Sequence, residues 1–230
     1  MKLIKIVLFL LYIITDIILL YIEIKLSVAV IVLLLILMSV SAAIHLFVHE
    51  CGHLVGGLIS GYKLVSLQIG PINITTDRSD KILFSLKHTR GGQCIMVPSD
   101  NAVLHYKAYN FGGIYANAFI SVISSLLLLV DSFYATLFFV QLLFIGILKI
   151  IINLFPYMDH SVPNDGYIVE LLKRDSTIQK DYVVYLSLYA ALFWNENVCR
   201  DEYSYSRKPA KNDEDLLYYN GIQKLLESIR

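Results

Sequence analysis

Four stretches of this chain are long and apolar enough to cross a lipid bilayer, and they limit the possible folds more than any other feature. A spanning helix needs about 20 consecutive apolar residues. The four stretches are residues 3–22, 27–59, 111–130 and 133–155. Only 17% of all residues are charged, against about 25% in soluble domains. The sequence therefore predicts an integral membrane protein, mainly α-helical, built as a bundle of about four spanning helices.

Residues 62–108, between the second and third stretches, follow a different pattern. Apolar and polar residues alternate through Val65–Ile69 and again, beyond a Gly-Pro pair, through residues 72–75. This alternation is typical of half-buried strands. Residues 82–86 and 93–97 are similar short segments. We expect a small β-element of three or four strands, associated with the membrane, between the second and third spans.

The pattern divides the chain into three segments: an N-terminal anchor helix (1–25), a core (26–175) and a C-terminal segment (176–230). Residues 181–194 are apolar over about 13 positions, too few for a span, so we expect a helix lying on the membrane or re-entering it. Its aromatic residues would lie at headgroup level. They are Tyr182, Tyr185, Tyr189 and Trp194. The remaining tail reads as cytoplasmic and partly helical.

Loop charges give an expected orientation. Lysines 2 and 5 precede the first span, and the β-element carries several basic residues. Because basic loops stay in the cytoplasm, the N-terminus and the β-element are expected there. Counting spans then puts residues 49–53 and 153–166 on one cytoplasmic face. Formal net charge is zero, so nothing points to nucleic acid as a partner.

A metal-binding motif, His49-Glu50-Cys51-Gly52-His53, closes the second apolar stretch. Its two histidines, spaced i and i+4, share one helix face and can reach one metal ion. Glu50 can orient and deprotonate water at the metal. Charge at a bilayer centre costs about 2.5–3.5 kcal/mol, which a bound ion would offset. The three cysteines (51, 94 and 199) lie far apart and form no disulfide framework or cysteine cluster.

Catalytic zinc needs a third protein ligand. His45 is excluded because it lies eight residues from His53, about 12 Å along the helix, so packing is its expected role. Asp165, in an Asp-Gly pair after the last span, is the best candidate. Asp159 and His160 are the alternatives.

At these residues the chain resembles the site-2 protease family of intramembrane zinc metalloproteases, in its small bacterial form without a PDZ domain. His49–His53 matches the family's His-Glu-x-x-His motif, and Gly112–Asn117 resembles its Gly-x-x-x-Asn segment. Asn153–Pro156 with Asp165-Gly166 resembles its Asn-x-x-Pro…Asp-Gly signature, and Gly91-Gly92 a glycine pair of its β-element. The match covers roughly residues 27–170. The departures are a longer gap before Asp165, Asn164 in place of leucine, and no proline near Gly112.

The resemblance implies a zinc endopeptidase with zinc held by His49, His53 and Asp165 and with Glu50 as the base. It implies that Asn117 binds substrate or oxyanion; a hydrogen bond between helices is its alternative role. The substrate would be a membrane-spanning or membrane-anchored peptide or protein in a bacterial cell membrane, cleaved in peptide maturation or regulated proteolysis. An edge strand of the β-element could hold it extended, or the element is simply a structural cap.

Two rival functions remain open at this stage. One is a metal-handling transporter. The small number of spans and the lack of an inverted repeat argue against it. The other is a non-hydrolytic membrane interaction or immunity protein that retains the fold.

Overall fold

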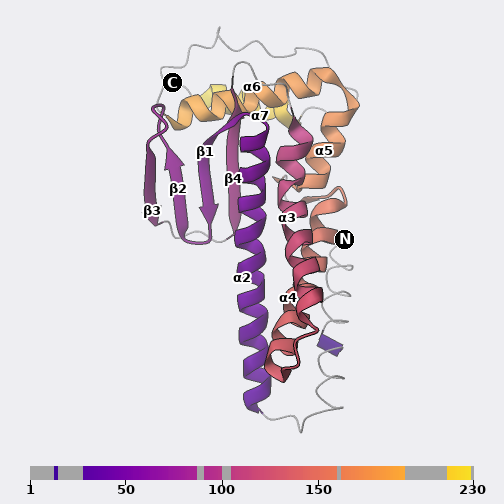
Figure 1. Cartoon of the computed structure of the whole chain (residues 1–230). Helices are drawn as coiled ribbons and strands as arrows, with labels where there is room; N and C mark the ends of the chain where they lie inside the picture. The colour runs from indigo at the N-terminus through magenta and orange to yellow at the C-terminus, as the bar shows by residue number, and fades with distance from the viewer. Residues whose placement is uncertain are drawn as a thin grey trace. The chain divides into compact units, whose positions relative to one another are not determined.

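The described part of the chain holds three helices that could span a membrane. A computed structural model describes residues 13–14, 28–86, 91–99, 105–159, 162–194 and 217–228 (Figure 1). The candidate spans are α2 (Val28–Ile59), α3 (Tyr106–Leu127) and α4 (Phe133–Leu154). Of the predicted first span, all but residues 13–14 lies outside the described residues. The structure thus shows a mainly helical, membrane-type chain with three candidate spans among the described residues, where the sequence predicted four.

Two compact units make up the chain, one of residues 1–45 and 117–152, the other of residues 46–116 and 153–230. The unit boundaries fall inside α2, α3 and α4, so each of these helices contributes to both units.

The first unit contains the N-terminal part of α2, the C-terminal part of α3 and most of α4. His45 is fully buried and joins the three helices: its Nδ1 lies 3.0 Å from Asn117 Oδ1, and its Nε2 lies 2.8 Å from the Leu142 carbonyl oxygen. Large apolar side chains, such as Leu35 and Phe119, are exposed on the outer faces. A polar interior with an apolar exterior suits helices surrounded by lipid.

A four-stranded antiparallel sheet forms in the second unit, in the order β3-β2-β1-β4. The strands are β1 (Tyr62–Ile69), β2 (Ile72–Thr76), β3 (Ile82–Leu86) and β4 (Gly92–Pro98). They cover all four segments in which the sequence alternates, so the prediction of a small sheet between spans is confirmed. β1 is central, and both Val65 and Leu67 are buried in it. β3 and β4 are the edge strands.

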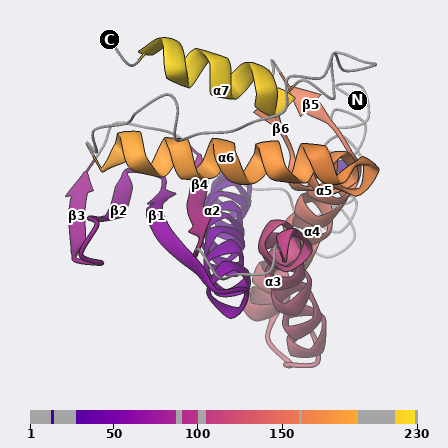
Figure 2. The same ribbon diagram turned by 90° about the horizontal axis from the view of Figure 1, so that it is seen from above.

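The C-terminal elements complete the second unit. A short hairpin, β5 (Met158–Asp159) with β6 (Val162–Pro163), leads into α5 (Asp165–Arg174) and α6 (Ser176–Phe193), and α7 (Leu217–Ser228) follows later. In Figures 1 and 2, α6 crosses one end of the sheet and α7 lies along α6. At the far end of α6, the Trp194 indole donates a hydrogen bond to the Thr76 carbonyl oxygen.

The aromatic residues of α6 differ from their predicted role. The helix forms where expected, but Tyr182 is only 3% exposed and belongs to the main hydrophobic core. Headgroup-level placement is therefore wrong for Tyr182, because this face of α6 packs on protein. Of the cysteines, Cys51 and Cys94 are free thiols, and Cys199 lies outside the described residues.

Candidate metal centre

The C-terminal half of α2 places His49, Glu50 and His53 against the start of α3. The two helices touch through backbone: a Cβ atom on Gly52 would lie 2.3 Å from the Gly112 carbonyl oxygen. This close approach brings the Tyr109 carbonyl oxygen within 2.8 Å of His53 Nδ1. His53 Nδ1–H donates to that oxygen, which leaves the Nε2 lone pair available to a metal, the usual arrangement for a metal-binding histidine.

Asp165 is the first residue of α5, and its position is fixed by the residues on either side. The Asn164 side chain caps the helix by accepting a hydrogen bond from the Tyr167 N–H at 2.9 Å. Gly166 packs on the end of α4: a Cβ atom there would lie 2.2 Å from the Leu154 carbonyl oxygen. An acidic residue is also favoured electrostatically at a helix N-terminus.

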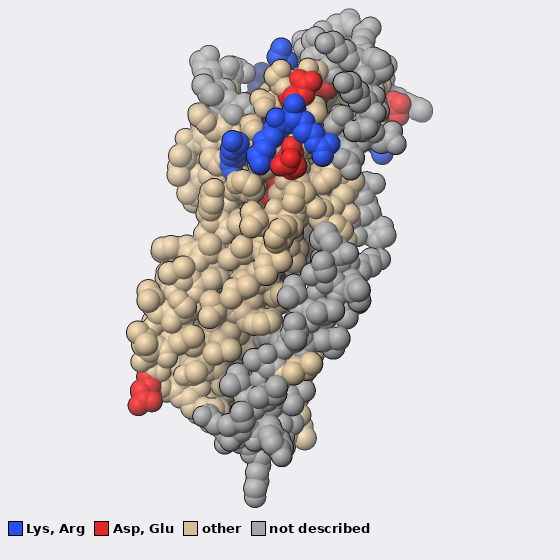
Figure 3. Space-filling view, turned by 90° about the vertical axis from the view of Figure 1, so that its right-hand side faces the viewer, with Lys and Arg blue, Asp and Glu red and all other residues tan. Residues whose placement is uncertain are grey.

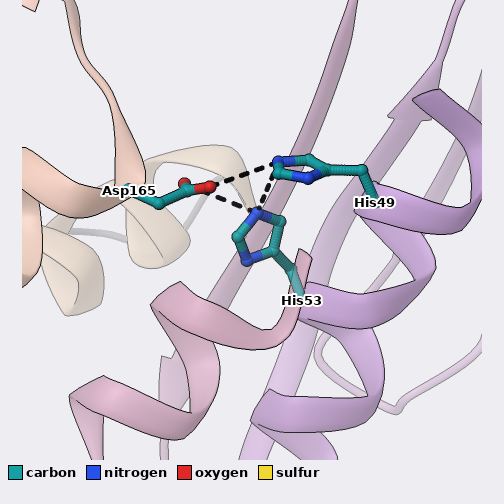
Figure 4. Close-up of side chains that lie close together, drawn as sticks. All are labelled: His49, His53 and Asp165. Carbon is teal, nitrogen blue, oxygen red and sulfur yellow. Dashed lines mark hydrogen bonds and ion pairs between the residues drawn. The ribbon is translucent and has the colours of Figure 1, made fainter. Parts of the chain in front are cut away.

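Three ligand atoms from these elements converge (Figure 4). His49 Nε2 and His53 Nε2 lie 3.1 Å apart. Asp165 Oδ2 lies 3.2 Å from His49 Nε2, and Asp165 Oδ1 lies 3.5 Å from His53 Nε2. The side chains of His49, His53 and Asp165 are 12%, 9% and 16% exposed. The structure thus brings together the ligand set predicted from the sequence in a largely buried group that could hold a metal ion.

The spacing of the three atoms fits a single metal ion. A tetrahedral ion with bonds of about 2.1 Å holds neighbouring ligand atoms about 3.4 Å apart. The two histidine nitrogens lie 3.1 Å apart, and each lies within 3.5 Å of one Asp165 oxygen. Asp165 Oδ2 is buried and faces His49 Nε2. Gly113 lets α3 pack directly against the two imidazole rings, because a Cβ atom there would lie 2.7 Å from His53 Nε2. Two imidazoles and a carboxylate that converge in a largely buried place are the arrangement expected of a cation site.

The chemistry of the three ligands and the ionisation of Asp165 indicate which metal ions suit the site. Two imidazoles with one carboxylate suit first-row transition metals or zinc, whereas magnesium and calcium prefer oxygen ligands. Burial alone would raise the pKa of the Asp165 carboxyl, but its contacts with His49 and His53 outweigh burial and hold the pKa at about 2. Asp165 is therefore an ionised ligand throughout the physiological pH range.

Glu50 is buried beside β4. Its side chain is 5% exposed, and it packs on Gly92, the first residue of that strand. A Cβ atom on Gly92 would lie 2.4 Å from Glu50 Oε1 and 2.7 Å from Glu50 Cδ. Any larger residue at this position would displace the Glu50 carboxylate. The candidate base thus lies where an edge strand begins.

The other residues that the sequence suggested for the site lie in different places in the structure. Asn117 belongs to the first unit, where it contacts His45; this is the helix–helix contact of its alternative role, and its role at an oxyanion stays a prediction. Asp159 lies in β5, and His160 lies outside the described residues. Among the described residues, the group able to hold a metal consists of His49, His53 and Asp165.

Sequence reasoning missed Tyr109, and it named Gly92 and Gly113 only as parts of motifs, without their contacts to Glu50 and the histidines. The Tyr109 contact uses a backbone carbonyl, which any residue carries, so its identity gives no signal. A signal did exist for the close helix pair, since Ala108, Gly112 and Ala116 recur every four residues on α3. Small residues at this spacing allow helices in membranes to approach closely.

Fold and site together define a class: a mainly α-helical, membrane-type chain with a small antiparallel sheet and a buried His-His-Asp group that could hold a metal ion. Comparisons of the chain with protein-family models, with curated proteins and with solved structures found no match.

Proposed function

We propose that this protein is a zinc-dependent intramembrane endopeptidase, a small member of the site-2 protease family. The observation that carries the proposal is the convergence of His49, His53 and Asp165 around one point, with Glu50 next to His49 in the sequence and buried against β4. The separations of the three ligand atoms suit zinc, and a glutamate between two zinc-binding histidines is typical of metallopeptidases.

The residues of the site have separate roles in this proposal. His49, His53 and Asp165 hold zinc, which, when bound, lowers the pKa of water towards 7 and polarises a carbonyl oxygen. The Glu50 carboxylate takes a proton from the attacking water and gives it to the departing amine nitrogen. Tyr109 and Asn164 hold two of the ligands in place through the contacts described above.

Strand β4 offers a way to hold the substrate. A transmembrane helix has its backbone bonded internally, so the substrate must unwind before its peptide bond can be attacked. β4 pairs with β1 on one side only among the described strands, and an extended peptide could add to its other side. Because Glu50 packs on the first residue of β4, a peptide added there would pass beside the base.

Charge supports the proposed orientation. The second unit carries basic residues in the sheet and in α5, where Lys173 and Arg174 form the last turn. Figure 3 shows basic and acidic side chains gathered near α5. By the positive-inside rule we propose that this unit, and the site with it, faces the cytoplasm of a bacterial cell. The substrate class is then a membrane-spanning or membrane-anchored peptide or protein.

Zinc content is the first test. The full chain, purified in detergent, should carry one zinc per molecule. Asp165→Ala should lose it, while Asp159→Ala, a matched change six residues earlier, should retain it. Wild-type protein that holds no zinc, even after reconstitution, would refute the proposal and favour a non-hydrolytic membrane interaction or immunity protein.

Proteolysis is tested separately, with a panel of model transmembrane peptides reconstituted in vesicles. Glu50→Gln should retain zinc and lose cleavage, because the substitution removes the proton acceptor but keeps the side chain's size. Zinc retained without cleavage by the wild type would instead favour the interaction protein. Cleavage by Glu50→Gln at the wild-type rate would remove Glu50 from the mechanism.

A further inference from the structure

Five tyrosines are buried together in the second unit, and they come from five different elements. They are Tyr62 in β1, Tyr109 in α3, Tyr167 in α5, Tyr182 in α6 and Tyr218 in α7, and none is more than 9% exposed. All five belong to one hydrophobic core. Phenylalanine would fill such a core without adding polar atoms, so the hydroxyl groups need partners.

The hydroxyl groups differ in how they are bonded. The Tyr109 hydroxyl donates to the Cys94 carbonyl oxygen at 2.6 Å. The Tyr182 hydroxyl accepts from Asn110 Nδ2 at 3.5 Å, a long contact that leaves its own proton to be donated elsewhere. The hydroxyls of Tyr62 and Tyr218 are buried, and neither has a hydrogen-bond partner in the part of the chain that the structure describes. A buried hydroxyl without a partner is destabilising, and proteins commonly satisfy such groups with internal water.

Tyr182 lies at the centre of this group. Its ring centroid is 4.8 Å from that of Tyr218. Burial raises the pKa of Tyr182, and the nearby Tyr62 hydroxyl and Asp165 carboxylate raise it further. Burial likewise raises the pKa values of Tyr62 and Tyr218. All three phenols therefore stay neutral and can both donate and accept hydrogen bonds.

We infer that the hydroxyls of Tyr62, Tyr182 and Tyr218 bind internal water molecules, forming a hydrated seam in the core that also contains Tyr109, whose carbonyl oxygen contacts His53. Water fits the chemistry better than an ion does, because the three hydroxyls are uncharged. A water molecule donates and accepts at once, and it needs two to four polar partners. These hydroxyls supply such partners in an otherwise apolar core.

The inference stands independently of the proposed function, since it follows from the buried hydroxyls alone. If the chain is a hydrolase, the seam has an added meaning. Hydrolysis consumes one water per bond, while the side chains of the metal centre are at most 16% exposed. Water held in the core next to Tyr109, whose ring lies 5.9 Å from that of His53, would then be a local supply for this site.

Hydroxyl-radical labelling of the full chain in detergent, performed in water enriched in oxygen-18, tests the inference. Radicals form from bound water as well as from bulk water, so a buried tyrosine beside internal water is labelled faster than its exposure predicts. Tyr109 is the matched control: its ring lies 5.4 Å from that of Tyr62 and is slightly more exposed, but its hydroxyl has a protein partner. We expect Tyr62 and Tyr218 to be labelled severalfold faster than Tyr109. Labelling no faster than that of Tyr109 would overturn the inference.

A second variant excludes simple opening of the core. Opening would label Tyr62 and the neighbouring Tyr109 alike. Tyr62→Phe removes the hydroxyl that holds the water, so labelling at position 62 should fall to the level of Tyr109. The same variant should leave stability unchanged or lower it. If the hydroxyl had no partner at all, its removal would raise the folded-to-unfolded ratio by a factor of about 5 or more. Unchanged fast labelling at position 62, or a gain in stability of that size, would contradict the seam.

Discussion

Replacing Gly113 with alanine should weaken metal binding strongly while leaving the fold intact. The added Cβ atom would lie 2.5 Å from His49 Cε1, 2.6 Å from His49 Nδ1 and 2.7 Å from His53 Nε2. Ordinary contacts begin at 3.4 Å, so the nearer ring must move by 3.4 − 2.5 = 0.9 Å. A retreat of α3 would separate the backbones of α2 and α3 where they pack closely, at Gly52 and Gly112.

A displacement of this size is large for a metal site. Ligand distances are held to about ±0.2 Å, and even losing an outer contact costs 10–100-fold in affinity. We therefore expect zinc affinity to fall by about 100-fold or more. Competition with a chromophoric chelator measures it, and Tyr115→Ala, at a 64% exposed position on the same helix, is the control. Wild-type affinity in Gly113→Ala would refute the placement of both histidines.

Four further predictions concern neighbouring parts of the site. On acidification, zinc should be released well above pH 2, with the uptake of two protons. The pKa of Asp165 is held at about 2, so protons must compete with zinc for the two imidazoles instead. A zinc-sensitive dye follows the release, and release near pH 2 with the uptake of one proton would contradict the prediction. Without metal, that lowered pKa stabilises the fold above about pH 4, and the contribution is lost as pH falls towards 2. Gly92→Ala should retain zinc but lose cleavage, because its Cβ atom would displace the Glu50 carboxylate; metal analysis beside a peptide assay separates the two effects. Asn164→Ala should weaken zinc binding, since the loss of a helix cap costs about 0.5–2 kcal/mol. Asn164→Asp keeps the acceptor oxygen, so this variant should bind zinc more tightly than Asn164→Ala does.

Local patterns made most of the fold predictable. The strands were found because alternation in residues 65–75 has a period of two, and the glycine and proline at positions 70 and 71 mark the turn between them. The spans α2 and α4 were found because a bilayer demands about 20 apolar residues. The histidine pair was found because a helix fixes the relation between residues four apart.

Features that depend on tertiary contacts were harder to predict. Asp165 could be proposed as a ligand, but only the fold brings it to His53, 112 positions earlier in the chain (165 − 53 = 112). The aromatic residues of α6 were assigned to the headgroup region because composition alone cannot tell a membrane interface from a protein core. Tyr182 is suited to either environment, and the sheet and α7 decide which one it occupies.

The segment between α4 and Asp165 shows how local bonding can place a ligand. It contains the β5–β6 pair, in which Met158 is paired with Pro163 and Asp159 with Val162. Asn164 closes the segment: its Oδ1 accepts from Tyr157 N–H at 3.0 Å, and its Nδ2 donates to the Phe155 carbonyl oxygen at 2.8 Å. These bonds hold the start of α5 close to the end of α4. A leucine at position 164 could make neither bond, so the asparagine side chain both closes this segment and caps the helix that carries Asp165.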